Sequence, residues 1–409
     1  MKIIRIAGRI IVGLVFMFSG FVKAIDPMGF TYKFHDYFQA FHLGFLDFLS
    51  LPLSIFFCTI EFIAGLSVLS GIRQKEGIWV VMILMMIFTP LTLILALTNP
   101  VSDCGCFGDA IHLTNWQTFG KNIILVPFVL ILFFAINSKS YRSLQKTEWA
   151  ILSSFVALFV IFCFSNLRYL PVMDFLPYKT GTNIPEKMII PEGMPVNEYK
   201  TTFIYEKDGL KKEFTLDNYP ADDTSWVFVD QVSVLVKKGY QPPINDLSIT
   251  TVENEDLTDK ILSDKGYSLL LISTKLKEAD DENLQKGFEL GSHCNEAGIN
   301  FYVITSSVSD EVKDYSNGLL FCTADEITLK TMVRSNPGYI LLREGNIVGK
   351  WSWANVPEND WFKDEMAVRQ IEKLHNRNSL LYVILIAVSF SMILLLIGIL
   401  LKNRIYYRQ

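Results

Sequence analysis

Charged side chains are scarce in this chain of 409 residues. Asp, Glu, Lys and Arg make up 19% of the residues, whereas hydrophobic residues make up 50%. The hydrophobic residues gather in blocks too long for ordinary core helices, and about 20 consecutive apolar residues suffice to cross a bilayer. A purely water-soluble protein is therefore excluded, and the lipid bilayer is an expected partner.

An excess of positive charge is also missing. The formal net charge is −5, and acidic runs such as Asp280-Asp281-Glu282 concentrate in residues 165–379, while the apolar part is net basic. Because nucleic-acid binding relies on a clustered basic surface, a nucleic-acid partner is excluded. The acidic runs are typical of a solvated face.

The apolar residues form six blocks, each near the length of a membrane span. In a bilayer, a helix satisfies all its own backbone polar groups, so each block predicts a spanning helix and both termini lie on one side. The fourth block is the shortest. The blocks are residues 6–24, 51–69, 78–97, 122–136, 149–164 and 380–401.

Basic residues fix the predicted orientation, because loops rich in Lys and Arg stay in the cytoplasm. No small-x-small cleavage site follows the first block, which we therefore keep as an anchor. Both termini are predicted to be cytoplasmic, and the loop near residue 104 and residues 165–379 face a compartment where disulfides persist. The basic clusters are Lys2, Arg5 and Arg9; Arg73 and Lys75; Lys139, Arg142 and Lys146; and Lys402, Arg404 and Arg408.

The outward loop Asp103-Cys104-Gly105-Cys106-Phe107-Gly108-Asp109 carries two thiols one residue apart. Gly105 permits the sharp turn that so small a disulfide ring needs, and the strained bond should be easily reduced. Cys104 and Cys106 are therefore the candidate catalytic redox pair. Two alternatives stay open: a structural staple, and a site for a soft cation such as Cu(I), although the loop contains no His or Met. We assign no metal.

The surroundings of these thiols decide whether a thiolate can form. The carboxylates of Asp103 and Asp109 would raise the thiol pKa unless Lys121 or the start of the following helix offsets them. Farther from the loop, Cys58 and Cys163 are accessory candidates for an electron path, or simply small hydrophobic residues of their spans.

Glu61 is the one acidic residue well inside a span, where a carboxylate is costly unless paired or neutral. Lys23 is the nearest basic candidate in depth, and a protonated Glu61 bonded to Ser or Thr is the alternative. A proton relay or quinone contact and a structural polar contact both stay open. No cofactor is certain from these residues, and a quinone stays open as one.

An aromatic-rich stretch, residues 30–48, joins the first two blocks. Its periodicity predicts an amphipathic helix at the outer interface, anchored by its aromatic side chains. His35 and His42 flank this stretch, and we assign them neither metal nor heme.

The outward segment changes its pattern near residue 249. Before it, strand-and-turn patterns at 201–205 and 211–216 predict one hairpin, and 226–229 with 232–236 predict a second pair. After it, strands and helices alternate. Predicted strands are 267–273, 301–305, 319–322, 339–343 and 347–351, and predicted helices are 282–297, 309–315 and 325–334.

This second order resembles the thioredoxin fold, in which a proline, often cis, precedes the final hairpin. Pro337 occupies that place, but residues 273–279, where the family carries Cys-x-x-Cys, contain no cysteine. The resemblance therefore implies a domain without the usual active site. Cys294 and Cys322 are expected to be either a structural pair or two buried thiols.

The membrane part also resembles a known family. Phe18-Ser19-Gly20, Lys23 and Asp26-Pro27 at the end of the first block, with the Cys-Gly-Cys-Phe-Gly loop, resemble the DoxX/MauE family of four-helix membrane proteins. The resemblance covers residues 5 to about 136 and implies a redox-associated membrane protein. The methylamine-utilisation member is associated with maturing a disulfide-rich periplasmic enzyme.

The predicted fold class is an α-helical membrane bundle with an extracytoplasmic α/β domain. Its parts are a four-helix membrane domain (1–137), a fifth span (138–164), a β-rich linker module (165–248), a thioredoxin-like domain (249–378), and a sixth span with a cytoplasmic tail (379–409). The predicted location is the bacterial inner (plasma) membrane, with a periplasmic domain.

Three function classes follow. The first is a thiol–disulfide oxidoreductase component that exchanges disulfides, or passes electrons, with an extracytoplasmic thiol protein. The second is a non-catalytic scaffold or assembly factor whose thioredoxin-like domain binds a partner. The third is a transporter-like bundle, for which Glu61 and Lys23 are meagre evidence of a polar path. We take the first as the main hypothesis.

Overall fold

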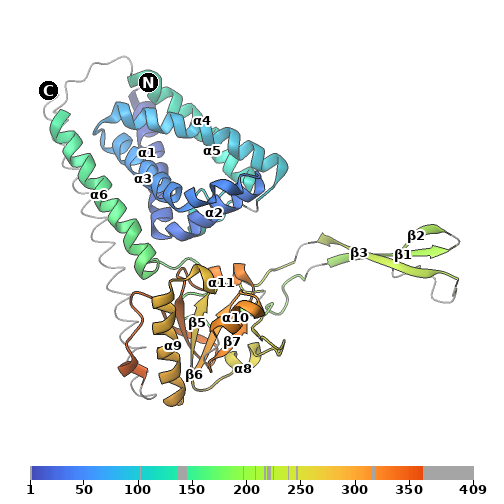
Figure 1. Cartoon of the computed structure of the whole chain (residues 1–409). Helices are drawn as coiled ribbons and strands as arrows, with labels where there is room; N and C mark the ends of the chain where they lie inside the picture. The colour runs from blue at the N-terminus through green and yellow to red at the C-terminus, as the bar shows by residue number, and fades with distance from the viewer. Residues whose placement is uncertain are drawn as a thin grey trace. The chain divides into compact units, whose positions relative to one another are not determined.

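A computed structural model of the chain describes residues 2–101, 103–136, 145–196, 198–207, 209–215, 218, 223, 225–237, 239–245, 247–315 and 318–362 (Figure 1). The predicted sixth span, 380–401, lies outside the described residues. The chain divides into two compact units, Thr182–Leu247 and the remainder. Each is described separately.

Among the residues that the structure describes, five helical segments of the larger unit are long and apolar enough to cross a membrane. The first five predicted spans are therefore confirmed as helices. The fourth starts earlier than predicted, at Asn115 rather than residue 122. Its first turns carry buried polar side chains, among them Asn115 and Thr118, which made the sequence resemble a loop. The long helices are α1 (Lys2–Ile25), α3 (Ser50–Ser70), α4 (Gln74–Thr98), α5 (Asn115–Ile136) and α6 (Gln145–Tyr169).

Helices α1 and α3 pack backbone to backbone because glycines lie at their crossing. A Cβ atom added to Gly20 would lie 2.5 Å from the Phe62 nitrogen, and one added to Gly65 would lie 2.4 Å from the Met17 nitrogen. Small residues permit such close approach between membrane helices. This approach brings the end of α1 against the middle of α3.

A shared apolar cluster holds α1, α3, α4 and α5 together as a four-helix core, with Val12, Val68, Val81 and Val129 buried in it. Helix α6 packs on α1 and α3, and the Phe159 ring stacks on Phe62 with centroids 4.3 Å apart.

Shorter helices cover the loop ends of this core. Asp26 caps α2 (Pro27–Ala40) by accepting a 2.8 Å hydrogen bond from the Gly29 nitrogen. The prediction of one helix over 30–48 was wrong in extent, because α2 ends at Ala40 and a separate helix, η1 (Gly44–Leu49), follows. The loop before α5 contains η2 (Gly108–Ala110).

The rest of this unit is an α/β domain (Figure 1). Its sheet has the strand order β4-β7-β6-β5-β8-β9. Strands β5, β6 and β7 are parallel neighbours, whereas β8 and β9 at one edge and β4 at the other pair antiparallel. The strands are β4 (Thr250–Thr251), β5 (Tyr267–Ser273), β6 (Asn300–Thr305), β7 (Leu320–Thr323), β8 (Gly338–Arg343) and β9 (Asn346–Ser352). The helices are α8 (Thr258–Leu262), η3 (Leu276–Glu278), α9 (Asp281–Glu296), α10 (Ser309–Tyr315), α11 (Glu326–Met332) and η4 (Asn359–Phe362).

The predicted alternation of strands and helices after residue 249 is confirmed, because each predicted element is present within a few residues of its expected bounds. Every residue of β5 is buried, as expected for a strand covered on both faces. The Asn336–Pro337 peptide bond is cis and directly precedes β8.

The smaller unit contains α7 (Ile184–Met188) and a sheet of order β2-β1-β3. Strands β1 (Glu198–Lys207) and β2 (Leu210–Thr215) form the predicted first hairpin. The predicted second pair was wrong: β3 (Val227–Lys237) is one continuous strand paired with β1. Ile204 pairs with Asp230 and Tyr205 with Phe228, so Val229 is an extra residue that forms a bulge instead of a turn.

Candidate functional site

Cys104 and Cys106 lie in the loop between α4 and α5, and that loop folds back on itself. Gly105 has φ +62°, a left-handed conformation that glycine adopts without strain. The Gly105 nitrogen donates to Asp103 Oδ1 at 2.8 Å, and the Gly108 nitrogen donates to the Gly105 carbonyl at 3.0 Å. These contacts hold the two sulfur-bearing residues on one tight turn.

A buried ion pair lies beneath this turn. Lys23 Nζ is 2.8 Å from each carboxylate oxygen of Glu61. Ser19 Oγ lies 2.7 Å from Glu61 Oε2 and 2.7 Å from the Cys106 carbonyl oxygen, either of which can accept its proton. The expected partnership of Glu61 and Lys23 is confirmed, and Ser19 connects this pair to the cysteine loop.

Cations from distant parts of the sequence compensate the two loop carboxylates. Lys33 Nζ lies 2.9 Å from Asp103 Oδ2, and Arg334 Nη2 lies 2.7 Å from Asp109 Oδ2. Lys121, the expected offset, places its Nζ over the Phe107 ring, 4.6 Å from the centroid. These cations therefore offset the negative charge by which Asp103 and Asp109 were expected to raise the pKa of the two thiols.

The two thiols differ in acidity. A hydrogen bond with the Cys106 side chain is the main influence that lowers the pKa of Cys104 to about 6, and the charge of Lys121 lowers it further. The same hydrogen bond, followed by burial, raises the pKa of Cys106 well above its ordinary value. At neutral pH the arrangement favours a thiolate on Cys104 and a thiol on Cys106, which is the division of roles that disulfide exchange needs.

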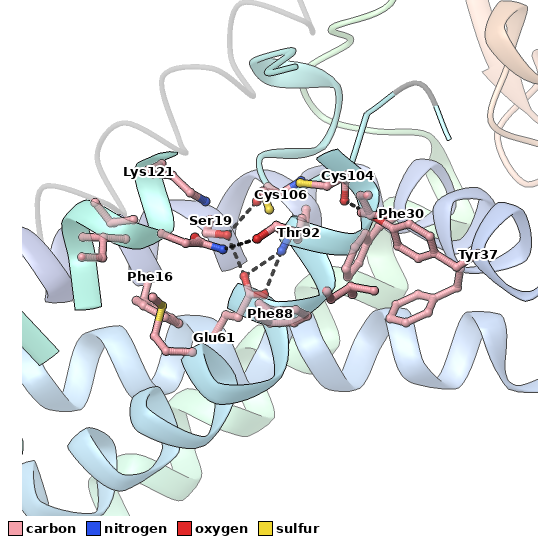
Figure 2. A pocket seen from close by; sticks show the side chains of 18 residues that line it. Phe16, Ser19, Phe30, Tyr37, Glu61, Phe88, Thr92, Cys104, Cys106 and Lys121 are labelled. Carbon is pink, nitrogen blue, oxygen red and sulfur yellow. Dashed lines mark hydrogen bonds and ion pairs between the residues drawn. The ribbon is translucent and has the colours of Figure 1, made fainter. Parts of the chain in front are cut away.

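The thiols border a cavity of about 80 Å³ inside the helical core (Figure 2). Its lining combines polar side chains, among them Ser19, Glu61 and Thr92, with aromatic ones, among them Phe30 and Phe88. Asn122 Nδ2 donates to Thr92 Oγ1 at 3.1 Å. The Tyr37 hydroxyl donates to the Cys104 carbonyl at 2.6 Å, so α2 also fixes the loop.

The remaining cysteines lie elsewhere. Cys58 and Cys163 are fully buried in one aromatic cluster between α3 and α6, and neither lines the cavity. Cys294 on α9 and Cys322 on β7 are fully buried, and all six cysteines are free thiols. Within the described parts of the chain, no three His, Cys, Asp or Glu residues are grouped as a metal site.

Sequence reasoning missed several residues of this site. Lys33, Tyr37 and Arg334 contact the loop although long stretches of chain separate them from it. Asp26 was noted only as part of the Asp-Pro pattern, and it contacts Arg334 Nε at 2.9 Å. A single sequence carries no signal for such long-range pairs. The Asp-Pro dipeptide was the sole local hint, because it is typical of a helix start.

Comparison with known proteins agrees with a membrane role for the helical part. The family "Methylamine utilisation protein MauE" matches residues 1–135, which include both loop cysteines. A protein named TlpB from Flavobacterium psychrophilum is 26% identical over 138 residues, or 33% of this chain and 38% of that protein. The chain therefore matches well under half of that relative's length. A domain family of unknown function, DUF8463, matches residues 199–238, and no solved structure matches the chain.

Proposed function

We propose that this protein is a membrane thiol–disulfide component, in which Cys104 and Cys106 exchange disulfides with an extracytoplasmic thiol protein. The observation that carries the proposal is geometric: two free thiols lie one residue apart on one tight turn, and the Cys106 nitrogen donates a hydrogen bond to the Cys104 sulfur at 3.3 Å. The lowered pKa of Cys104 supports it, because the thiolate is the species that reacts in disulfide exchange. The matched MauE segment contains both cysteines and supports a membrane setting for them.

The exchange takes place in two steps. The Cys104 thiolate attacks a disulfide of the partner, forms a mixed disulfide and releases one partner thiolate. Cys106, after losing its proton, then attacks the Cys104 sulfur, releases the second partner thiolate and leaves a Cys104–Cys106 disulfide. Two electrons pass to the partner, and the reverse sequence oxidises a partner dithiol. The charges of Lys121 and Lys23 partly offset the raised pKa of Cys106 and so assist the loss of its proton in the second step.

The proposal includes a topology. Six spans, with both termini in the cytoplasm, would place the loop and the α/β domain in the periplasm of a bacterial inner membrane. The basic clusters support this orientation. The α/β domain would be thioredoxin-like, which is supported by its sheet order and by the position of Pro337 directly before β8.

Quinone does not enter this proposal. The cavity beside the thiols holds about 80 Å³, whereas a buried cavity that binds benzene measures about 150 Å³. An aromatic ring therefore does not fit this cavity as it stands in the structure.

A non-catalytic scaffold is the second candidate, and one observation favours it. The segment after β5, residues 274–280, carries no cysteine, so the α/β domain has no thiol where thioredoxin-like enzymes have theirs. In that case the domain only binds a partner, and thiol exchange at the loop is not needed.

In-cell thiol trapping separates these candidates. Cells are quenched with acid, free thiols are labelled with a mass-tagged maleimide, and wild type is compared with Cys104→Ser and Cys106→Ser. The proposed function predicts a mixture of reduced and oxidised loop in wild type, and loss of function in both variants at unchanged abundance. If both variants keep full function, the exchange proposal fails and the non-catalytic scaffold takes its place. If both variant proteins disappear from the membrane, the cysteine pair is a structural staple.

A further inference from the structure

Arg334 connects the α/β domain to the cysteine-bearing end of the helical bundle. It lies between α11 and the cis Asn336–Pro337 bond and is only 8% exposed. Its Nε contacts Asp26 Oδ2 at 2.9 Å, and its Nη2 contacts Asp109 Oδ2 at 2.7 Å. Its Nη1 donates to the Lys330 carbonyl at 2.6 Å, which fixes the guanidinium to α11. We call Arg334, Asp26 and Asp109 the latch.

An aromatic contact extends the latch. The Tyr32 ring of α2 lies 5.3 Å from Arg334 Cζ and 5.0 Å from Lys330 Nζ. Cations over a ring face are attracted by its π electrons. Two acids and a tyrosine of the bundle thus meet two cations of the α/β domain, and the charges are complementary.

The latch lies inside the area that a folded partner of Cys104 would need. The hydrogen bond between Gly105 and Gly108 closes a four-residue turn, and such a turn spans less than about 7 Å. With one Cα step of about 3.8 Å at each end, Cys104 and Asp109 lie at most about 15 Å apart. A protein interface of standard size covers about 800 Å² per partner, or about 16 Å in radius. A folded protein centred on Cys104 therefore overlaps the latch.

We propose that the α/β domain is an intramolecular cap on the Cys104/Cys106 loop, held closed by the latch, and that a folded thiol partner docks on the surface of Asp26, Tyr32 and Asp109 after the cap leaves it. The partner's role rests on the proposed function, whereas the cap itself is a statement about access. The latch requires the fork of an arginine, since one guanidinium serves two carboxylates and a carbonyl.

The test compares a small and a large thiol reagent on the full-length protein in membrane vesicles. Cys106→Ser is the background, so that Cys104 stays reduced, and mass spectrometry quantifies its label. N-ethylmaleimide reports the reactivity of the loop itself, and a 5-kDa polyethylene glycol maleimide reports access for a bulky molecule. Arg334→Gln should raise the ratio of large-reagent to small-reagent rates at least tenfold. The matched control, Arg343→Gln, removes an arginine that stacks on Tyr267 within the α/β domain and should change the ratio less than twofold.

Asp109→Asn provides a second, isosteric opening of the latch and should raise the ratio about threefold, because Asp26 still holds Arg334. An unchanged ratio in both variants would overturn the cap. So would an equal rise of both rates, since that result indicates a loosened loop rather than an uncovered one. The rate ratio measures access whether or not the cysteines cycle, so a failure of the proposed function in thiol trapping leaves this test intact.

Discussion

Lys23 and Glu61 form an ion pair whose side chains are only 4% and 3% exposed, and this pair lies beneath the cysteine loop. Two geometric features keep it in place. Ser19 connects Glu61 to the Cys106 carbonyl, and Lys23 Nζ lies 4.5 Å from the centroid of the Phe30 ring. Because Lys23 lies on α1 and Glu61 on α3, the ion pair forms only while those two helices are packed together.

Removing one partner of this pair should cost more than removing both. Glu61→Leu leaves a buried ammonium uncompensated and Lys23→Met leaves a buried carboxylate, each destabilising by about 3–5 kcal/mol. The double variant replaces both charges by apolar groups and should lie much closer to wild type. Thermal unfolding of the detergent-solubilised protein measures all four forms. A double variant whose loss equals the sum of the single losses would show that the two charges do not interact.

The α1–α3 crossing should tolerate no side chain at Gly20. An added Cβ would lie 2.5 Å from the Phe62 nitrogen and 2.6 Å from the Cys58 carbonyl oxygen. Gly20→Ala should therefore destabilise the protein by about 1–3 kcal/mol, the usual cost of overpacking. Gly120→Ala is the matched control, since nothing lies within 4 Å of its added Cβ, and alanine there gains about 1 kcal/mol of helix propensity. Equal melting temperatures for the two variants would contradict the close crossing.

The sequence alone predicted the elements whose signal is local. Apolar blocks located α1, α3, α4 and α6, because burial in lipid requires long uninterrupted runs. Strand β5 was predicted at its observed bounds, because a fully buried strand is a short apolar run. The sequence did not indicate the start of α5, because this first turn is polar like a loop. Asn115 Nδ2 donates hydrogen bonds there to Asn99 Oδ1 and to the Val101 carbonyl.

The candidate site was predictable only in part, for a related reason. Cys104, Cys106, Glu61 and Lys23 were selected because thiols in an outward loop and charges in a span are unusual in themselves. The compensation of Asp103 by Lys33, and of Asp109 by Arg334, depends on which distant segments meet. The acidity of Cys104 depends in turn on how its thiol faces that of Cys106. None of these pairings has a spacing that a single sequence displays.

The proposed topology predicts the side of the membrane on which each loop lies. Paired reporters, one active only in the cytoplasm and one only outside it, should give cytoplasmic signals after residues 137 and 409. Fusions at residues 109 and 246 should give the outside signal, because the basic clusters flank only the other loops. A cytoplasmic signal at residue 109 would remove the redox proposal, since thiols there are kept reduced.

Cys294 and Cys322 should be dispensable for thiol exchange. Burial raises the pKa of Cys294 to about 12 and that of Cys322 to about 11, so both remain protonated at neutral pH and cannot act as nucleophiles. The double variant Cys294→Ala/Cys322→Ala should keep the redox state of the loop in thiol trapping unchanged, with a stability loss of about 1 kcal/mol per site. A shift of the loop toward one redox state would show that these thiols take part.

The reactivity of Cys104 should depend on pH in a way that identifies its neighbour. A hydrogen bond with Cys106 lowers the pKa of Cys104 to about 6, so the thiolate predominates above that pH. In the reduced wild-type protein, the rate of Cys104 alkylation by iodoacetamide should therefore fall about tenfold per pH unit below 6 and level off by about pH 7. Cys106→Ala removes the hydrogen-bond donor and should move the midpoint upward, toward the ordinary thiol value near 8.5. Cys106→Ser keeps a hydroxyl donor and should hold the midpoint nearer to that of wild type. A wild-type midpoint at or above pH 8 would mean that the loop does not activate Cys104, and the exchange mechanism would lose its nucleophile.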